Sequence, residues 1–374
     1  MKKLGIYIHI PFCIKKCNYC AFLSFPIDEN LKREYLKALK KEIMLNENKE
    51  YIVDTVFLGG GTPSLLEPKE IDDIIMNLNS YFNISKDAEI TMEANPGTLK
   101  FENLLGFKEA GINRLSLGVQ SLDEDVLSHM GRIHNAEDVY WEYELARKAG
   151  FNNINLDLMF SVPNYNIFKI KRTLTRAIKL KPEHISYYGL QLEEGTPYFE
   201  QFKKGMFHET DDYMDRRMYH EGSRLLINKG YNRYEISNFS KHGYECKHNL
   251  KYWNMDEYLG LGLGSSSFIG GYRLKNAEDI NSYINFDKKP IIEKHHNSKN
   301  DNVSEAIFTG LRKTEGIEIS SVLGSESAFW EYFNNIKDVI WEYEMDGCLI
   351  IDQGRIRFTE YGIDISNKIL ANFV

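Results

Sequence analysis

The alternation of apolar and polar stretches along the first 210 residues predicts strands and helices in regular succession. Stretches with apolar residues at helical spacing, such as 28–48, 136–149 and 167–180, separate shorter apolar runs that are typical of buried strands. These runs begin near residues 4, 55, 89, 114, 154 and 184. Strands that alternate with helices form parallel sheets with right-handed crossovers. We therefore predict an α/β fold with six strand–helix units.

Six units are fewer than the eight that close a complete barrel, so the pattern is compatible with an open six-unit barrel and with a doubly wound sheet. Each predicted strand ends in glycine or polar residues. Because functional groups collect at the carboxyl ends of parallel strands in both architectures, we expect the functional site there.

The pattern changes after residue 210. We expect a helix at 211–229, with Asp211 at its start, and a strand at 231–236. An aromatic and polar segment follows, and then glycines alternate at 260, 262 and 264. Alternating glycines allow close backbone approach, and we interpret this part as a lid or a connecting segment.

The last part of the chain predicts a small separate unit. Residues 287–303 are polar and are expected to form a linker. Helices are expected at 305–311 and 330–344, followed by a hairpin that turns at 352–354 and by a last helix. This order is typical of an α+β, winged-helix-like domain.

Composition and charge narrow the functional class. A net charge of −8 argues against a nucleic-acid-binding surface, which is usually basic. The N-terminus shows no signal-peptide pattern, and no apolar run reaches the roughly 18 residues that a membrane span requires. We therefore expect a cytoplasmic protein that does not bind nucleic acid.

Three of the five cysteines, Cys13, Cys17 and Cys20, lie on one short loop directly after the first predicted strand. Crowding of this kind is typical of metal binding rather than of a disulfide framework. An iron–sulfur cube normally takes four thiolates, so three would leave one iron open unless Cys246 or Cys348 completes the set. A zinc site that adds His9, Cys246 or His248 is the alternative.

Polar groups follow several of the other predicted strands. The run GGGTP at 59–63 would let bare backbone approach a ligand. Glu93 and Asp157 offer carboxylates for hydroxyl or amino groups, and Gln120 and Arg132 offer donors. Each feature alone is weak evidence of a binding site, but the recurrence of such features at successive strand ends favours a shared ligand site.

The motifs YIHIPFCIKKCNYCAF, GGGTPS, EANPGTL, GVQSLDEDVLSHMGRIH, LDLMFSVP, HNLKYW and EAIFTGLRKTEGI span nearly the whole chain. With them the chain resembles the coproporphyrinogen-oxidase-like branch of the radical S-adenosylmethionine (SAM) superfamily, and most closely the HemW-type haem chaperones. The resemblance implies a partial (β/α)6 barrel. It also implies a core barrel at 1–210, a connecting segment at 211–290 and a HemN-like C-terminal domain at 291–374.

The resemblance further implies a [4Fe–4S] cluster held by Cys13, Cys17 and Cys20, with SAM bound to the open iron. The residues that match the family's SAM contacts are Tyr7, Tyr19, Gly60, Gly61, Thr62, Glu93, Gln120, Arg132 and Asp157.

Two positions favour a haem carrier over a porphyrinogen oxidase. The oxidases resemble a pattern with a further cysteine two residues after the third, where this chain has Phe22. The run from His248 to Trp253 is similar to the HNxxYW motif associated with haem binding, and a neutral imidazole can ligate iron. The resemblance therefore implies binding of haem and its delivery to respiratory haem proteins. An oxygen-independent coproporphyrinogen III oxidase is the alternative.

Two departures from the family pattern are Ser161 and Ser266, where relatives often carry a glycine and a histidine.

A radical SAM methyltransferase or a haem-opening enzyme is a further alternative, because one fold supports many reactions. Peripheral membrane association and a homodimer also remain open.

Overall fold

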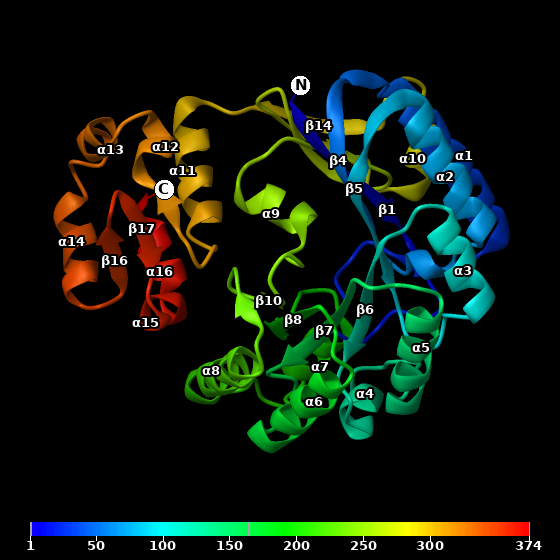
Figure 1. Ribbon diagram of the computed structural model, residues 1–374, viewed down its shortest axis with the longest axis horizontal. Coiled ribbons are helices and arrows are strands. Elements are labelled where there is room, and N and C mark those ends of the chain that lie inside the picture. Colours follow the sequence, from blue (N-terminus) through cyan, green and yellow to red (C-terminus); the bar gives the residue numbers. More distant parts are fainter. Residues whose placement is uncertain (1, 164, 374) are drawn as a thin grey trace.

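The computed structural model describes residues 2–163 and 165–373, and this part of the chain contains a sheet of twelve strands. Six parallel strands follow one another in chain order at its centre and curve around a common interior (Figure 1). These strands are β1 (Lys3–Ile10), β4 (Asn48–Gly60), β5 (Phe82–Ala94), β6 (Arg114–Gln120), β7 (Ile154–Phe160) and β8 (His184–Gly189). The predicted partial barrel is confirmed.

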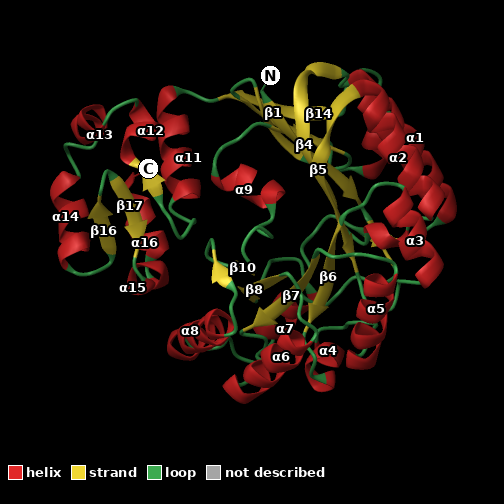
Figure 2. Ribbon diagram, in the orientation of Figure 1, coloured by secondary structure: helices red, strands yellow, loops and turns green. Residues whose placement is uncertain are grey.

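Helices cover the convex face of the curved sheet (Figure 2). They are α1 (Glu29–Leu45), α2 (Pro68–Tyr81), α3 (Phe101–Glu109), α4 (Glu124–His129), α5 (Ala136–Lys148) and α6 (Ile167–Lys179). Asp28 caps α1, because its carboxylate accepts a hydrogen bond from the backbone N–H of Leu31 at 2.8 Å. The apolar residues of the strands and helices form one continuous core.

Strand β1 lies between two parallel neighbours, β4 and β11 (Tyr258–Leu261). Its side chains at Leu4, Ile6 and Ile8 are fully buried, which explains the nearly continuous apolar run. The glycines after residue 258 therefore belong to the main sheet, and the expectation of a lid is wrong. A Cβ atom on Gly260 would lie 2.2 Å from the carbonyl oxygen of Ser266, so the close approach itself was predicted correctly.

Beyond β11 the sheet continues with three antiparallel strands, β12 (Ser266–Ile269), β13 (Tyr272–Asn276) and β14 (Ile291–His296). The predicted linker at 287–303 is wrong, since it contains β14 and the start of α11 (Lys299–Gly310). Nearly all residues of β14 are exposed, so this edge strand has no apolar pattern to reveal it. At the other edge lie β10 (Asn238–Ser240) and β9 (Asn232–Arg233). The strand predicted at 231–236 is therefore shorter than expected, because β9 spans two of its residues.

The C-terminal residues form a second unit with its own apolar core. Its three-stranded sheet has the order β15 (Ile317–Glu318), β17 (Arg355–Phe358), β16 (Leu349–Asp352), and β16 and β17 form the predicted hairpin. The single helix predicted at 330–344 is wrong, because α13 (Glu326–Tyr332) and α14 (Lys337–Met345) are separate helices. The remaining helices of this unit are α12 (Ile319–Leu323), α15 (Glu360–Asp364) and α16 (Ser366–Leu370).

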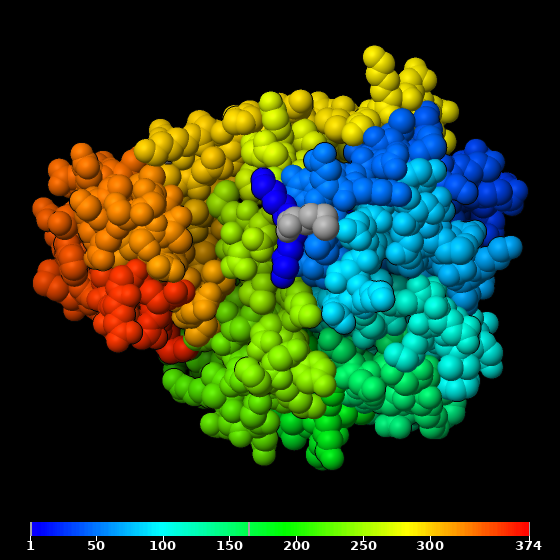
Figure 3. Space-filling model, turned by 45° about the horizontal axis from the view of Figure 1, so that its top comes forward, coloured from blue at the N-terminus to red at the C-terminus, as the bar shows by residue number. Residues whose placement is uncertain are grey.

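The two units are joined along one side of the barrel. In Figure 3 the orange and red C-terminal residues adjoin the yellow-green segment that contains α9 (Lys247–Trp253). Helix α11 packs on α9, and α8 (Asp212–Asn228) bonds to α15 through His220 and Asp364. None of the helices in the described ranges is long and apolar enough to cross a membrane.

Candidate functional site

A cavity of about 620 Å³ opens at the carboxyl ends of the parallel strands, where the sequence predicted the site. The cysteine loop, which follows β2 (Phe12–Cys13), forms one wall, and the ends of β4, β5 and β6 form another. Eleven of the predicted site residues line this cavity: Cys13, Cys17, Tyr19, Cys20, Gly60, Gly61, Thr62, Glu93, Gln120, Arg132 and Asp157. The other two, Tyr7 and His248, do not line it.

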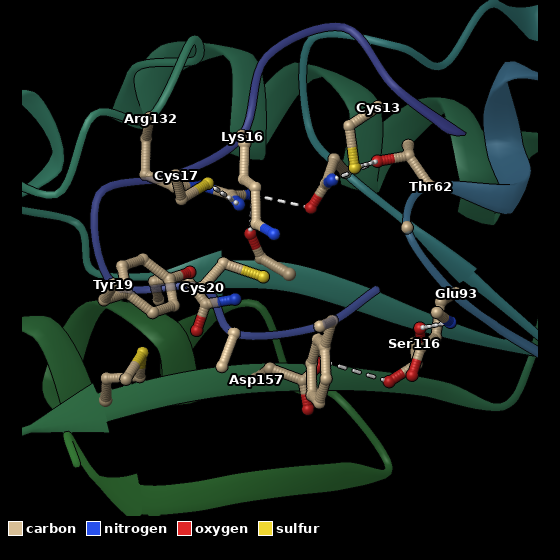
Figure 4. A pocket seen from close by; sticks show the side chains of 18 of the residues that line it. Cys13, Lys16, Cys17, Tyr19, Cys20, Thr62, Glu93, Ser116, Arg132 and Asp157 are labelled. Atoms are coloured by element: carbon tan, nitrogen blue, oxygen red, sulfur yellow. Dashed lines mark hydrogen bonds between the residues drawn. The ribbon is translucent and has the colours of Figure 1, made fainter. Parts of the chain in front are cut away.

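The three cysteines of the loop all line the cavity, and Figure 4 shows them spaced along the loop that curves around it. Thr62 donates a hydrogen bond from its hydroxyl to Sγ of Cys13 at 3.6 Å, and Arg132 donates from Nη1 to Sγ of Cys17 at 3.2 Å. Burial raises the pKa of the Cys20 thiol. The loop therefore presents three thiols, two of which already have a hydrogen-bond donor of the kind that stabilises a thiolate.

The three thiols and the hydrogen-bond donors beside them suit an iron–sulfur cluster with one open iron. Neither of the other two cysteines joins the set: Cys246 is buried and contacts the carboxylate of Glu89, and Cys348 lies in the core of the C-terminal unit. Among the residues that the structure describes, no group of three His, Cys, Asp or Glu side chains is arranged to hold a single metal ion. A zinc site with His9 would also disrupt bonds that His9 makes to Tyr7 and to the carbonyl of Leu23.

Arg132 is the centre of a hydrogen-bond network between the cysteine loop and the strand ends. Its Nη2 donates to Oδ1 of Asn95 and to the carbonyl oxygen of Gly118, both at 2.6 Å. The amide of Asn95 in turn donates to the hydroxyl of Thr62 at 2.7 Å. Asn95 thus joins the groups that contact Cys13 and Cys17. Sequence reasoning missed this residue, although it lies in the quoted motif EANPGTL directly after a strand.

The glycine run at the end of β4 passes close to the segment that leads from β1 into the cysteine loop. Gly60 has a φ of +110°, and a Cβ atom there would lie 2.5 Å from the ring of His9. A Cβ atom on Gly61 would lie 2.6 Å from the carbonyl oxygen of Phe12. The end of β4 and the segment before the cysteine loop can therefore meet only because these positions lack side chains.

Two buried carboxyl groups lie at the inner end of the cavity. Burial, together with the charge of Asp157, raises the pKa of Glu93 to about 8, so this carboxyl is largely protonated near neutrality. Glu93 accepts a hydrogen bond from the backbone N–H of Gly60 at 3.0 Å. Burial also raises the pKa of Asp157, which accepts hydrogen bonds from Ser116 at 3.1 Å and Asn155 at 2.8 Å. Such groups can donate to and accept from the hydroxyls of a bound nucleoside.

A second cavity of about 240 Å³ lies beneath the first and shares part of its wall. It contains the two predicted residues that the first lacks, Tyr7 and His248. The residues that line both cavities are Glu93, Ser116, Asp157, Ser186 and Asn249. The HNLKYW motif on α9 therefore forms part of the floor beneath the first cavity.

His248 is 1% exposed, and its ring stacks on Phe57. The hydroxyl of Thr55 lies 2.8 Å from Nδ1, and the hydroxyl of Tyr252 lies 2.9 Å from Nε2. Burial lowers the pKa of His248 to about 3, so the ring is neutral. A neutral ring suits iron ligation, but both of its nitrogens have hydrogen-bond partners, and an iron bond would require one partner to leave.

The positions that depart from the family pattern lie outside the two cavities. Ser161 has a φ of +55°, and its hydroxyl donates to Asp215 on α8. Ser266 is exposed on β12. Phe22, in contrast, lines the first cavity and is 68% exposed.

The fold and the site define a class of protein. Residues 7–177 match the radical SAM superfamily, and residues 297–365 match the HemN C-terminal domain. The structure resembles that of coproporphyrinogen III oxidase (HemN) from Escherichia coli with a TM-score of 0.87, at 22% identity and covering 100% of this chain and 90% of that chain. At this identity the likeness shows the shared fold. The chain therefore carries a radical SAM domain and a HemN C-terminal domain, and the radical SAM superfamily implies a [4Fe–4S] cluster and SAM.

Similarity along the whole length identifies the family within this class. The chain is 34% identical to the heme chaperone HemW of Bacillus subtilis over 379 residues, which cover 98% of both chains. It is 32% identical to HemW of Lactococcus lactis, covering 100% of this chain and 98% of the relative. The chain belongs to the HemW family, as the sequence motifs predicted.

Proposed function

We propose that this protein is a haem chaperone that holds a [4Fe–4S] cluster and SAM, binds haem and delivers it to respiratory haem proteins. The observation that carries this proposal is the similarity, along nearly the entire chain, to relatives named as heme chaperones. The exposed Phe22 at the cavity supports it, since an aromatic residue stands where the oxidase pattern has a further cysteine.

Cys13, Cys17 and Cys20 would hold the cluster in the larger cavity. When bound, the cluster supplies an open iron for SAM and an electron. Around it, the chain's own groups would orient the ligand: the guanidinium of Arg132 is held beside Cys17, and Gly60 and Gly61 form part of the cavity wall. Glu93 and Asp157 would bind the ribose hydroxyls, with neutral Glu93 as a donor.

His248 is the iron ligand that the motif suggests. We propose that it ligates haem after Tyr252 or Thr55 has released its ring nitrogen. We also propose that the protein acts in the cytoplasm, reaches recipients by peripheral association with the membrane, and comprises a core at 1–210, a connecting segment at 211–290 and a C-terminal domain at 291–374. A homodimer is compatible with this arrangement.

A haem titration of the anaerobically reconstituted protein tests the proposal. We expect a saturable Soret band with one haem per chain, and loss of the iron ligand in His248→Ala should shift this band while the cluster stays intact. Incubation with SAM, dithionite and coproporphyrinogen III tests the alternative. Formation of protoporphyrinogen at a catalytic rate, without haem binding, would establish an oxidase instead.

A further inference from the structure

The mouth of the larger cavity is apolar and exposed to solvent. Three large hydrophobic side chains line it: Ile14 is 49% exposed, Phe22 is 68% exposed and Ile133 is 47% exposed. Ile14 lies in the cysteine loop, Phe22 lies two residues after Cys20, and Ile133 directly follows Arg132. Exposed apolar residues are common singly, but a group of them around one cavity is typical of a binding surface.

Two cations stand beside this apolar surface. Lys15 and Lys16 line the same cavity and are exposed, and Figure 4 shows Lys16 extending into it from the cysteine loop. Within residues 2–163 and 165–373, neither lysine forms an ion pair. Arg132, by contrast, is already bonded to Asn95 and to Cys17. The exposed carboxylate of Glu193 also lines this cavity, so the mouth combines an apolar area with two unpaired lysines and one acidic group.

This combination fits a flat apolar molecule with two carboxylates. A tetrapyrrole such as haem has an apolar ring, whose burial is favourable, and two propionates that would attract the lysines. The floor of the site is less accessible, since His248 is buried and both ring nitrogens have partners. The second cavity, at about 240 Å³, is also much smaller than the first.

We propose that haem docks at the mouth of the larger cavity, with its ring on Ile14, Phe22 and Ile133 and its propionates toward Lys15 and Lys16. The choice of haem as the occupant rests on the proposed function. The site itself rests on the exposure, charge and common location of these five residues. Docking here depends on the ring and its carboxylates, so it does not require the iron to be ligated by His248.

Metal-free protoporphyrin IX tests whether docking depends on the ring and its carboxylates or on ligation of the iron. The full chain, with its cluster reconstituted, is titrated with protoporphyrin IX, with its dimethyl ester and with haem, and binding is followed by porphyrin fluorescence and by the Soret band. We expect the dissociation constant of protoporphyrin IX to lie within about fivefold of that of haem, because the site contacts the ring and the propionates, which both molecules have. The ester, which lacks both charges, should bind at least tenfold more weakly.

Variants locate the site. Phe22→Ser and Ile133→Ser should each weaken haem binding at least tenfold, while Phe168→Ser, which changes a phenylalanine on α6 that is 78% exposed, should leave it unchanged. Iron and sulfide content shows whether the cluster is retained. If Phe22→Ser alters that content, the charge reversals Lys15→Glu and Lys16→Glu provide the second test, with an expected loss of at least fivefold that shrinks at high salt.

The outcomes separate this proposal from the general function. Failure of the wild-type protein to bind haem at all would overturn the chaperone function. Normal haem binding by the mouth variants, with no binding of protoporphyrin IX and complete loss in His248→Ala, would overturn the mouth site and leave the chaperone function standing.

Discussion

Arg132 donates a hydrogen bond from Nη1 to Sγ of Cys17 at 3.2 Å, although the two residues are 115 positions apart in the chain. The contact joins the cysteine loop to the helix α4 region, and Asn95 extends it to Thr62 and Cys13. Hydrogen bonds to cluster sulfurs and to the groups around them tune both orientation and reduction potential.

Replacement of Asn95 tests this network. In Asn95→Ala, Arg132 and Thr62 each lose a hydrogen bond, and at about 1 kcal/mol per bond we expect SAM to bind roughly tenfold more weakly or worse. The reduction potential of the cluster should also shift. Equilibrium dialysis with SAM and a potentiometric titration followed by electron paramagnetic resonance measure the two effects. Asn79→Ala, which changes an exposed asparagine on α2, is the control.

The cysteines should divide into two groups. Replacement of Cys13, Cys17 or Cys20 by alanine should remove most of the iron and acid-labile sulfide, because each supplies one of only three thiols in the cavity. Cys246→Ala should retain both, since burial raises the pKa of Cys246 to about 12 and keeps it a neutral thiol. Metal analysis and the brown absorption decide this. Zinc in place of iron, or loss of iron in Cys246→Ala, would contradict the proposed ligand set.

The buried ring of His248 predicts a pH dependence of stability. Its pKa falls from 6.5 in the unfolded chain to about 3 in the folded chain, so below about pH 6.5 the unfolded state takes up a proton that the folded state does not. Stability is therefore lost as the pH falls from about 6.5 toward 3. Between pH 7 and pH 5 this group accounts for about 2 kcal/mol.

His248→Gln removes this proton uptake, so its loss of stability between pH 7 and pH 5 should be smaller than that of the wild type by about 2 kcal/mol. Urea unfolding at the two pH values measures the difference. Burial also lowers the pKa of other histidines, which keep part of the dependence in both proteins. His295→Gln, at an exposed position, is the control, and an unchanged dependence in His248→Gln would show that the ring is not buried in solution.

The contact between α8 and α15 should stabilise the C-terminal unit against the barrel. Asp364 accepts hydrogen bonds from His220 at 2.8 Å and from Arg216 at 3.5 Å. Asp364→Asn should cost about 1 kcal/mol, less at high salt, and should speed proteolysis between the units. Limited trypsin digestion measures this. Asp352→Asn, at the exposed end of β16, should digest like the wild type.

The sequence determined the central architecture because the six parallel strands are buried on both faces. Strand β1 shows this most clearly, since Leu4, Ile6, Ile8 and Ile10 are fully buried in a nearly continuous apolar run. The edge strand β14 could not be predicted, because pairing of its backbone with β13 holds it in place while its side chains stay in water. A local pattern reports burial, and β14 has almost none.

The same distinction applies to the site. The sequence alone identified the three cysteines and the groups at the strand ends, because short spacing and strand ends bring them together in any parallel α/β fold. Only the tertiary structure joined Arg132 to Cys17 through space, buried His248 between Thr55 and Tyr252, and raised the pKa of Glu93. Hydrogen bonds between distant segments and the loss of water around a side chain depend on how the whole chain packs, and no local pattern encodes them.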